Sequence, residues 1–240
     1  MLPTVTIHVV RHAEGFHNAT VNGHDIRDPY LTPKGLQQCV EFETTNRHKI
    51  DLVIASPMKR TIQTALYCFA PAIGNEKKQI ILLPDLLEFG LYQSNTGSPL
   101  KDLQQEFGNV LDVSHVKEDW YRDMTPLARD PIELNNRAQR ARDAIKAIIH
   151  NYIATMPEKE ARTTSSINVA VVTHRAFIPY LTNEDIVSAP HSSESRWKNT
   201  ECRLYQIPNF NDARAVAGSL EETDESLGRR NAQRATGSGR

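Results

Sequence analysis

Residues 4–10 read Thr-Val-Thr-Ile-His-Val-Val, and Arg-His-Ala-Glu follows directly at residues 11–14. The first seven residues are mostly β-branched and apolar, which is typical of a buried β-strand. The charged residues after them therefore stand where a strand ends. Sheets of parallel strands bind their ligands at that edge, so this stretch predicts both a central strand and a ligand site.

Strand and helix patterns alternate on either side of this stretch. Further strands are predicted at 51–55, 79–83, 167–173 and 201–207, the last of them at an edge. Helices are predicted over 33–47, 56–69, 100–107 and 133–154; Thr32 and Ser56, each followed by proline, are expected to cap the first two. This alternation predicts an α/β fold with three layers, α/β/α, in which helices cover both faces of a mainly parallel sheet.

The domain organisation is predicted to be simple. Residues 1–210 are expected to form one α/β domain, with a lid-like insertion after the third strand at about 85–131. Residues 211–240 contain few large apolar side chains, so they are expected to form a disordered tail.

Charge and composition narrow the class of protein. The chain has 28 Lys and Arg against 29 Asp and Glu, and this balance argues against a nucleic-acid-binding protein. No apolar run is long enough to span a membrane, the N-terminus does not resemble a signal peptide, and three dispersed cysteines form no disulfide framework. We expect a soluble cytoplasmic protein, and its oligomeric state stays open.

Chemistry-bearing residues follow four of the predicted strands. They are Arg11 and His12, Arg60, Glu88, and His174 with Arg175. Taken singly, each is more often an ordinary surface or capping residue, but their occurrence at successive strand ends indicates one site. Arginines bind phosphate through a rigid fork, an imidazole can attack phosphorus, and a carboxylic acid can protonate a leaving group.

Four ordered blocks of sequence resemble the histidine phosphatase superfamily, in its phosphoglycerate-mutase-like branch. They are Arg11-His12-Ala13-Glu14, Asp28-Pro29-Tyr30-Leu31-Thr32 with Gly35 and Gln38, Ser56-Pro57-Met58-Lys59-Arg60 with Gln63-Thr64-Ala65, and Leu87-Glu88 with Val171-Val172-Thr173-His174. The resemblance covers roughly residues 5–207. Asn95-Thr96-Gly97-Ser98 and Trp197-Lys198-Asn199-Thr200-Glu201 are closest in style to fungal phosphoglycerate-mutase-like proteins.

The resemblance implies a role for each matching position. His12 would be the nucleophile that forms a phosphohistidine, and Glu88 would be the general acid. Arg11, Arg60 and His174 would hold the phosphoryl oxygens, with Asn18 as a further donor. No metal and no cofactor are implied, and the partner would be a small phosphorylated molecule.

This chain departs from the family pattern at several positions. Ala13 replaces a glycine and is expected to place a methyl group close to the phosphate. Arg175 and Asn95 are expected to bind substrate, in places where the family often has Gly and Asp. The aromatic residues Phe89, Tyr92, Trp120 and Tyr121 would form either an apolar substrate wall or ordinary lid packing. Specificity is expected to reside in residues 89–131 and 190–198.

Four functions remain open at this stage. The leading one is a phosphatase that hydrolyses a phosphate or diphosphate ester of a small organic molecule. A mutase would use the same residues, and a repurposed binding protein would keep the fold without hydrolysis. A metal hydrolase, suggested by His12, His17 and His24, lacks a recognisable metal motif.

Overall fold

A seven-stranded mixed sheet organises the molecule. The computed structural model describes residues 3–46, 48–122, 129–184, 197–212 and 217–237. The strands are β1 (Thr4–Arg11), β2 (Leu52–Ala55), β3 (Ile80–Leu82), β4 (Leu111–Asp112), β5 (Ser166–Thr173), β6 (Cys202–Gln206) and β7 (Glu221–Glu222). Their spatial order is β4-β3-β2-β5-β1-β6-β7, with β4 to β1 parallel and β6 and β7 antiparallel to their neighbours. The expected α/β fold with a mainly parallel sheet is confirmed.

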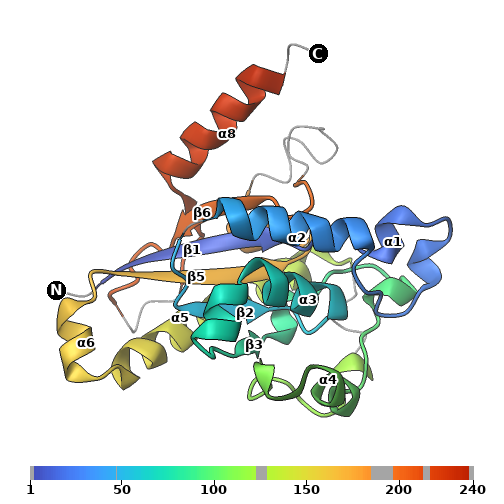
Figure 1. Ribbon diagram of the computed structural model, residues 1–240, viewed down its shortest axis with the longest axis horizontal. Helices are drawn as coiled ribbons and strands as arrows, with labels where there is room; N and C mark the ends of the chain where they lie inside the picture. Colours follow the sequence, from blue (N-terminus) through green and yellow to red (C-terminus); the bar gives the residue numbers. More distant parts are fainter. Residues whose placement is uncertain (1–2, 47, 123–128, 185–196, 213–216, 238–240) are drawn as a thin grey trace.

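Helices cover both faces of this sheet (Figure 1). The helices that the structure describes are α1 (Phe16–Ala19), α2 (Pro33–Thr45), α3 (Lys59–Cys68), α4 (Leu100–Phe107), α5 (Pro131–Thr155), α6 (Glu158–Thr163), α7 (Ile178–Thr182) and α8 (Asp224–Gly237). Alternate strand residues point to opposite faces, so Val9 and Val171 pack with α5 and α7. Val10 and Val172 belong to a second core cluster that includes residues of α2 and α3. Two hydrophobic layers therefore enclose the sheet.

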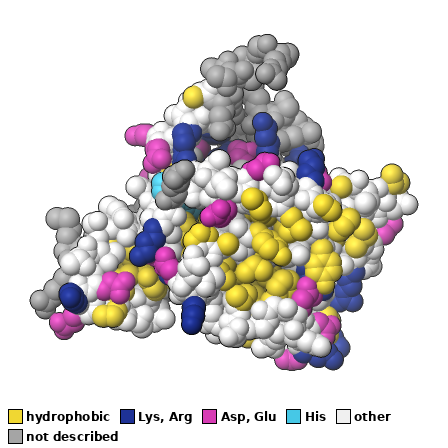
Figure 2. Space-filling model, in the orientation of Figure 1, with side chains coloured by type: hydrophobic (Ala, Val, Ile, Leu, Met, Phe, Trp, Pro, Cys, Tyr) yellow, Lys and Arg dark blue, Asp and Glu magenta, His cyan; other side chains and the backbone are white. Residues whose placement is uncertain are grey.

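The outer surface of α2 and α3 carries a concentration of hydrophobic side chains (Figure 2). Val40 and Tyr67 are exposed there, and Leu36 and Leu66 are partly buried. The inner faces of the same helices are buried, with Cys39 and Ile62 inaccessible to solvent. Helices α2 and α3 therefore pack on the sheet through their inner faces.

The helix over 56–69 begins later than its sequence indicates. Ser56 and Pro57 precede the helix, and Met58 stands at the N-cap of α3 without a side-chain hydrogen bond. Buried Asp28 caps the N-terminus of α3 instead, because its Oδ1 accepts a 2.9 Å hydrogen bond from the Lys59 backbone N–H. Thr32 caps α2 as expected, accepting from the Gly35 N–H at 3.0 Å.

The expected disordered tail is wrong for residues 217–237. Ala217 and Leu220 are buried in the core, and the Ala217 N–H donates to Asp143 Oδ1 of α5 at 2.8 Å. Strand β7 then pairs with β6, which is consequently not an edge strand. Backbone pairing and the two buried side chains of Ala217 and Leu220 hold this segment. The prediction was wrong because it rested on the low content of large apolar residues. Helix α8 follows and projects away from the body (Figure 1).

Candidate active site

The carboxyl ends of four adjacent parallel strands meet at one edge of the sheet. Strands β1 and β5 run side by side toward α1 in Figure 1, and β2 and β3 continue the parallel arrangement. Beyond this edge lies a cavity of about 360 Å³. Of the residues predicted to form the site, it is lined by Arg11, His12, Asn18, Arg60, Glu88, Asn95 and Arg175. Sequence-distant segments thus converge as the strand order requires.

His12 lies at the centre of this cavity with its ring orientation fixed. Its Nδ1 lies 2.7 Å from the carbonyl oxygen of Ala13, and because a carbonyl only accepts, Nδ1 carries the proton. Nε2 is left with its lone pair. Burial, together with the charges of Arg60 and Arg11, holds the pKa of His12 well below its usual value. The imidazole is therefore neutral at physiological pH and nucleophilic at Nε2.

His174 lies directly behind His12, with ring centroids 5.3 Å apart. It is fully buried and does not itself line the cavity. Its Nε2 lies 2.9 Å from Ser56 Oγ, so this serine orients the second histidine. Its Nδ1 is buried and has no hydrogen-bond partner. An unpartnered ring nitrogen beside His12 is suited to an oxygen of a bound anion.

Arg11 and Arg60 are buried cations held by backbone carbonyls. Arg11 donates from Nη1 to Trp197 O, and Arg60 donates from Nη1 to Ser94 O, both at 2.7 Å. Each also has a buried Nε without a partner. Burial lowers the pKa of both guanidinium groups to about 10, which still leaves them charged. Two desolvated charges facing one cavity favour an anion strongly.

Glu88 presents a carboxyl whose two oxygens are held by backbone N–H groups. Phe89 N donates to Oε1 at 3.2 Å, and Ala176 N donates to Oε2 at 3.0 Å. Burial raises the pKa of this carboxyl despite these bonds and the nearby charge of Arg60. A raised pKa suits a group that must donate a proton near neutral pH.

Asn95 and Asn18 use their amides to hold other residues. Asn95 Oδ1 accepts from Arg60 Nη2 at 3.3 Å, and its Nδ2 donates to the carbonyl oxygens of Phe89 and Gly90. Asn95 therefore positions Arg60, although it also lines the cavity. Asn18 Oδ1 accepts from Gly15 N at 3.2 Å, and Arg175 stands exposed at the rim.

Comparison with known proteins identifies the family. A family model described as histidine phosphatase superfamily (branch 1) matches residues 7–218. The chain belongs to this superfamily. It is 27% identical over 183 residues to a probable phosphatase of Schizosaccharomyces pombe, which covers 70% of this chain and 73% of that protein. A phosphoglycerate mutase-like protein of Arabidopsis thaliana is 43% identical over 76 residues, or 27% of this chain and 28% of that one.

Solved structures show the same fold. The ecdysone phosphate phosphatase of Bombyx mori superposes with a TM-score of 0.57 at 15% identity, covering 84% of this chain and 88% of that one. Within the described residues, no helix has the length and apolarity to cross a membrane.

Several motif residues support the site without facing it. Thr64 Oγ1 accepts from Ala13 N at 3.0 Å, and Gln63 Oε1 accepts from Leu31 N at 2.8 Å. Gln38 Oε1 accepts from Glu14 N, and Asn199 Nδ2 donates to the carbonyl of His12, both at 2.9 Å. The sequence blocks around α2 and α3 thus tie the segment after β1 in place.

His17 also belongs to the site, although its position in the sequence suggested only a possible metal centre. It lines the cavity, and its ring lies 5.3 Å from that of His12 and 6.0 Å from that of His24. Burial lowers the pKa of His17 to about 2, and its Nδ1 has no partner. In the described part of the chain, no three His, Cys, Asp or Glu residues form a group suited to a metal. His17 is thus a further neutral imidazole beside His12.

The structure places Ala13 and the four aromatic residues relative to the cavity wall. The methyl group of Ala13 does not line the cavity; it is fully buried in the core cluster that contains α3 residues. Of the four aromatic residues considered as a substrate wall, only Phe89 and Tyr92 line the cavity. Trp120 packs against Gly97 instead, and Tyr121 packs on the same hydrophobic cluster. Residues 190–196 lie outside the described part of the chain.

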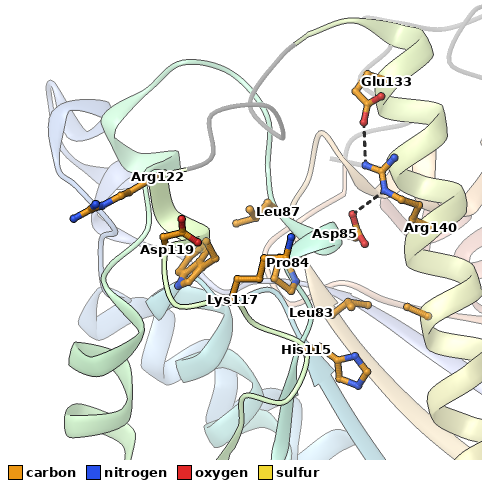
Figure 3. A pocket seen from close by; sticks show the side chains of 12 residues that line it. Leu83, Pro84, Asp85, Leu87, His115, Lys117, Asp119, Arg122, Glu133 and Arg140 are labelled. Carbon is orange, nitrogen blue, oxygen red and sulfur yellow. Dashed lines mark hydrogen bonds and ion pairs between the residues drawn. The ribbon is translucent and has the colours of Figure 1, made fainter.

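A larger cavity of about 740 Å³ is lined in part by Leu83, Asp85 and Leu87 of the segment that leads to Glu88 (Figure 3). Its walls include Asp85, Leu87, His115, Trp120 and Arg140, and neither His12 nor His174 reaches it. Arg140 is paired there with Asp85 and Glu133 at 3.4 and 2.9 Å. Without the paired buried histidines and the buried Arg11 and Arg60, this cavity lacks the chemistry of the smaller one.

Proposed function

We propose that this protein is a phosphatase that hydrolyses a phosphate or diphosphate ester of a small organic molecule through a phosphohistidine on His12. The observation that carries the proposal is the neutral His12 ring, with Nδ1 bonded to Ala13 O and Nε2 free. Around it stand two buried guanidinium groups. Membership of the histidine phosphatase superfamily supports it.

In the first step, His12 Nε2 attacks phosphorus and a P–N bond forms as the bond from phosphorus to the leaving oxygen breaks. Glu88 gives its proton to that oxygen, so the product leaves as a neutral alcohol. The transferring group spreads its charge over three oxygens, which Arg11, Arg60 and His174 stabilise. Asn18 and His17 contribute further polar contacts from the cavity wall.

In the second step, the ionised Glu88 takes a proton from water as the water oxygen attacks phosphorus. The P–N bond breaks, inorganic phosphate is released, and His12 and Glu88 return to their starting states. The same carboxyl serves as acid and then as base because its two backbone donors hold it in place throughout.

A phosphate-release assay across sugar, glycerate, nucleotide and prenyl phosphates tests the proposal. We expect wild-type protein to release phosphate and His12→Ala to be inactive. Glu88→Gln should lose about 10²–10⁴ in kcat on alkyl esters and much less on 4-nitrophenyl phosphate, whose leaving group needs no proton. His115→Ala, in the larger cavity, is the matched control.

Undiminished hydrolysis by His12→Ala would remove the proposal. An isomerised ester in place of free phosphate would indicate a mutase. Ligand binding without turnover of any ester would indicate a repurposed binding protein.

A further inference from the structure

The second histidine of the site, His174, takes part in phosphoryl transfer only if it can donate a hydrogen bond toward the anion. A neutral imidazole carries one proton, on either Nδ1 or Nε2, and donates only from the nitrogen that carries it. We propose that Ser56 is a positioning residue whose hydroxyl donates to His174 Nε2 and thereby holds the ring proton on Nδ1, as a donor for a phosphoryl oxygen. The place of the proton is a property of the folded protein, and only its use on phosphate rests on the proposed function.

The surroundings of His174 keep its ring neutral. The side chain is fully buried, and burial together with the nearby charge of Arg60 holds its pKa well below the usual value. A neutral ring presents one nitrogen as a donor and the other as an acceptor. The hydrogen-bond partners of the two nitrogens therefore decide which of them carries the proton.

The partner of Nε2 is the hydroxyl of Ser56, whose oxygen lies 2.9 Å away. Ser56 is inaccessible to solvent, and among the described residues its Oγ has no other hydrogen-bond partner. If Nε2 donated to Oγ, the serine O–H would be left buried without an acceptor, and the lone pair of Nδ1 would be left without a donor. If the hydroxyl donates to Nε2, only the Nδ1–H is left over. Unsatisfied buried groups are costly, so the second arrangement is favoured.

The backbone of Ser56 is fixed against the strand that leads to His174. Ser56 N donates to the carbonyl oxygen of Val172 in β5 at 3.0 Å, and Thr61 Oγ1 of α3 donates to Ser56 O at 2.7 Å. Pro57 follows and further restricts the conformation of Ser56. Strand β5 therefore sets the position of the serine as well as that of the histidine.

Nδ1 is the ring nitrogen left for the anion. It is buried and has no hydrogen-bond partner among the described residues, and its ring lies 5.3 Å from that of His12 between centroids. As a donor, Nδ1 would pair with an oxygen of a phosphoryl group on His12. As an acceptor, its lone pair would face that oxygen and repel it. The tautomer therefore decides whether His174 stabilises the phosphoryl group or opposes it.

The test is ¹⁵N NMR of the full chain labelled in its histidine rings, because protonated and unprotonated ring nitrogens resonate far apart. Comparison with His174→Gln assigns the signals of His174. We expect wild-type protein above neutral pH to show a protonated Nδ1 and an unprotonated Nε2. The opposite pattern, or protons on both nitrogens, would overturn the inference. This spectrum decides the place of the proton without any variant of Ser56.

Two substitutions then test the serine. Ser56→Ala removes the donor, so the proton should redistribute over both nitrogens and the Kd of inorganic phosphate should rise about two- to tenfold, the range of one neutral hydrogen bond. Ser56→Thr keeps a hydroxyl and should restore both readouts. Ser226→Ala is the matched control, because it removes a buried serine hydroxyl that donates to Glu222 outside the cavity, and it should change neither.

The outcomes separate this inference from the proposed function. An unchanged tautomer in Ser56→Ala would overturn the role of the serine, even if phosphate bound more weakly. A protonated Nδ1 that depends on Ser56, in a wild-type protein that releases phosphate from no ester, would support the inference and overturn the proposed function. Phosphate release by a protein whose His174 carries its proton on Nε2 would do the reverse.

Discussion

Arg137 of α5 is a buried cation next to the proposed acid. Its Nη1 donates to the carbonyl of Leu87 at 2.6 Å, and its guanidinium carbon lies 4.1 Å from the ring centroid of Phe177. Leu87 precedes Glu88, and Phe177 follows the residue whose N–H holds Glu88. Arg137 therefore braces both backbone segments that position the carboxyl, and its charge acts to lower the pKa of Glu88.

Replacing this cation should move the pH dependence of turnover. In the proposed first step Glu88 acts in its protonated form, so kcat should fall as the pH rises through its pKa. Arg137→Met removes a charge that lowers that pKa, and the falling limb should shift to higher pH. We expect kcat to fall as well, by less than the about 10²–10⁴-fold supplied by a general acid, because both backbone donors to Glu88 remain.

A kcat–pH profile of Arg137→Met beside Arg137→Lys makes this measurement. Lysine keeps the charge and should keep the limb near its wild-type position. A limb that moves to lower pH in the methionine variant would contradict the electrostatic role.

Residue positions at the site were more predictable than residue contacts. The sequence placed His12, Arg60, Glu88 and His174 at strand ends, and parallel strands then bring them together. It did not reveal that Asn95 holds Arg60 or that Ser56 orients His174, because such bonds depend on side-chain directions across sequence-distant segments. His17 was missed as a site residue because the four-residue helix α1 is too short to give a periodic signal.

At the scale of elements, the N-terminus of α2 packs against the segment that carries the proposed nucleophile, His12. A side chain added at Gly35 would collide with the backbone carbonyl of Glu14, which cannot move aside as a flexible side chain could. Thr32 and Lys34 also bind the Glu14 carboxylate, at 2.9 and 2.8 Å. Helix α2 thus fixes the backbone two residues beyond His12.

Gly35→Ala should separate α2 from this segment. We expect the free energy of unfolding to drop by about 1–3 kcal/mol, as overpacked sites do, and turnover to fall with it. Gly74→Ala is the matched control, because nothing lies within 4 Å of a Cβ added there. Urea denaturation of both variants decides the matter; equal stabilities would refute the close approach.

Elements with a clear hydrophobic periodicity were predicted from the sequence, and elements without one were missed. Helix α4 appears over the predicted residues 100–107, and α5 begins two residues before the predicted start because Asp130 caps it. Strand β4 has two residues and strand β7 has two, too short to leave a pattern. The docking of Ala217 and Leu220 was missed for a similar reason, since two apolar residues in a polar stretch carry little signal.

At the scale of the whole molecule, buried neutral histidines make stability depend on pH. Burial lowers the pKa of His8 from 6.5 to about 4 and that of His17 to about 2, and it holds those of His12 and His174 well below 6.5. Below about pH 6.5 the unfolded chain protonates these groups and the folded protein does not. The stabilisation that comes from keeping these histidines neutral is therefore fully present above about pH 6.5 and is lost as the pH falls.

The buried carboxyls of Glu88 and Asp28 act in the opposite direction, because burial raises their pKa values. Four histidines outnumber two carboxyls, so we expect a net loss of stability between about pH 6.5 and 5. Each histidine contributes a slope of up to about 1.4 kcal/mol per pH unit. Urea unfolding at several pH values should show this loss, and stability that is constant or rises toward pH 5 would contradict it.

His8→Gln isolates one of these histidines. His8 is buried away from the cavity, with Nε2 3.0 Å from Asn168 Oδ1, and a glutamine amide can supply a donor there. The variant should lower the slope of the unfolding free energy against pH by the contribution of one histidine, up to about 1.4 kcal/mol per pH unit. Phosphate release should be unchanged.

The most direct measurement is rapid acid-free quenching of wild-type protein during turnover of 4-nitrophenyl phosphate, followed by peptide mass spectrometry. We predict one phosphoryl group, stable to alkali and labile to acid, on the imidazole of His12, with none on His12→Ala. A phosphoryl group on another residue, or steady turnover by a His12→Ala protein that never becomes phosphorylated, would contradict the central role of this histidine.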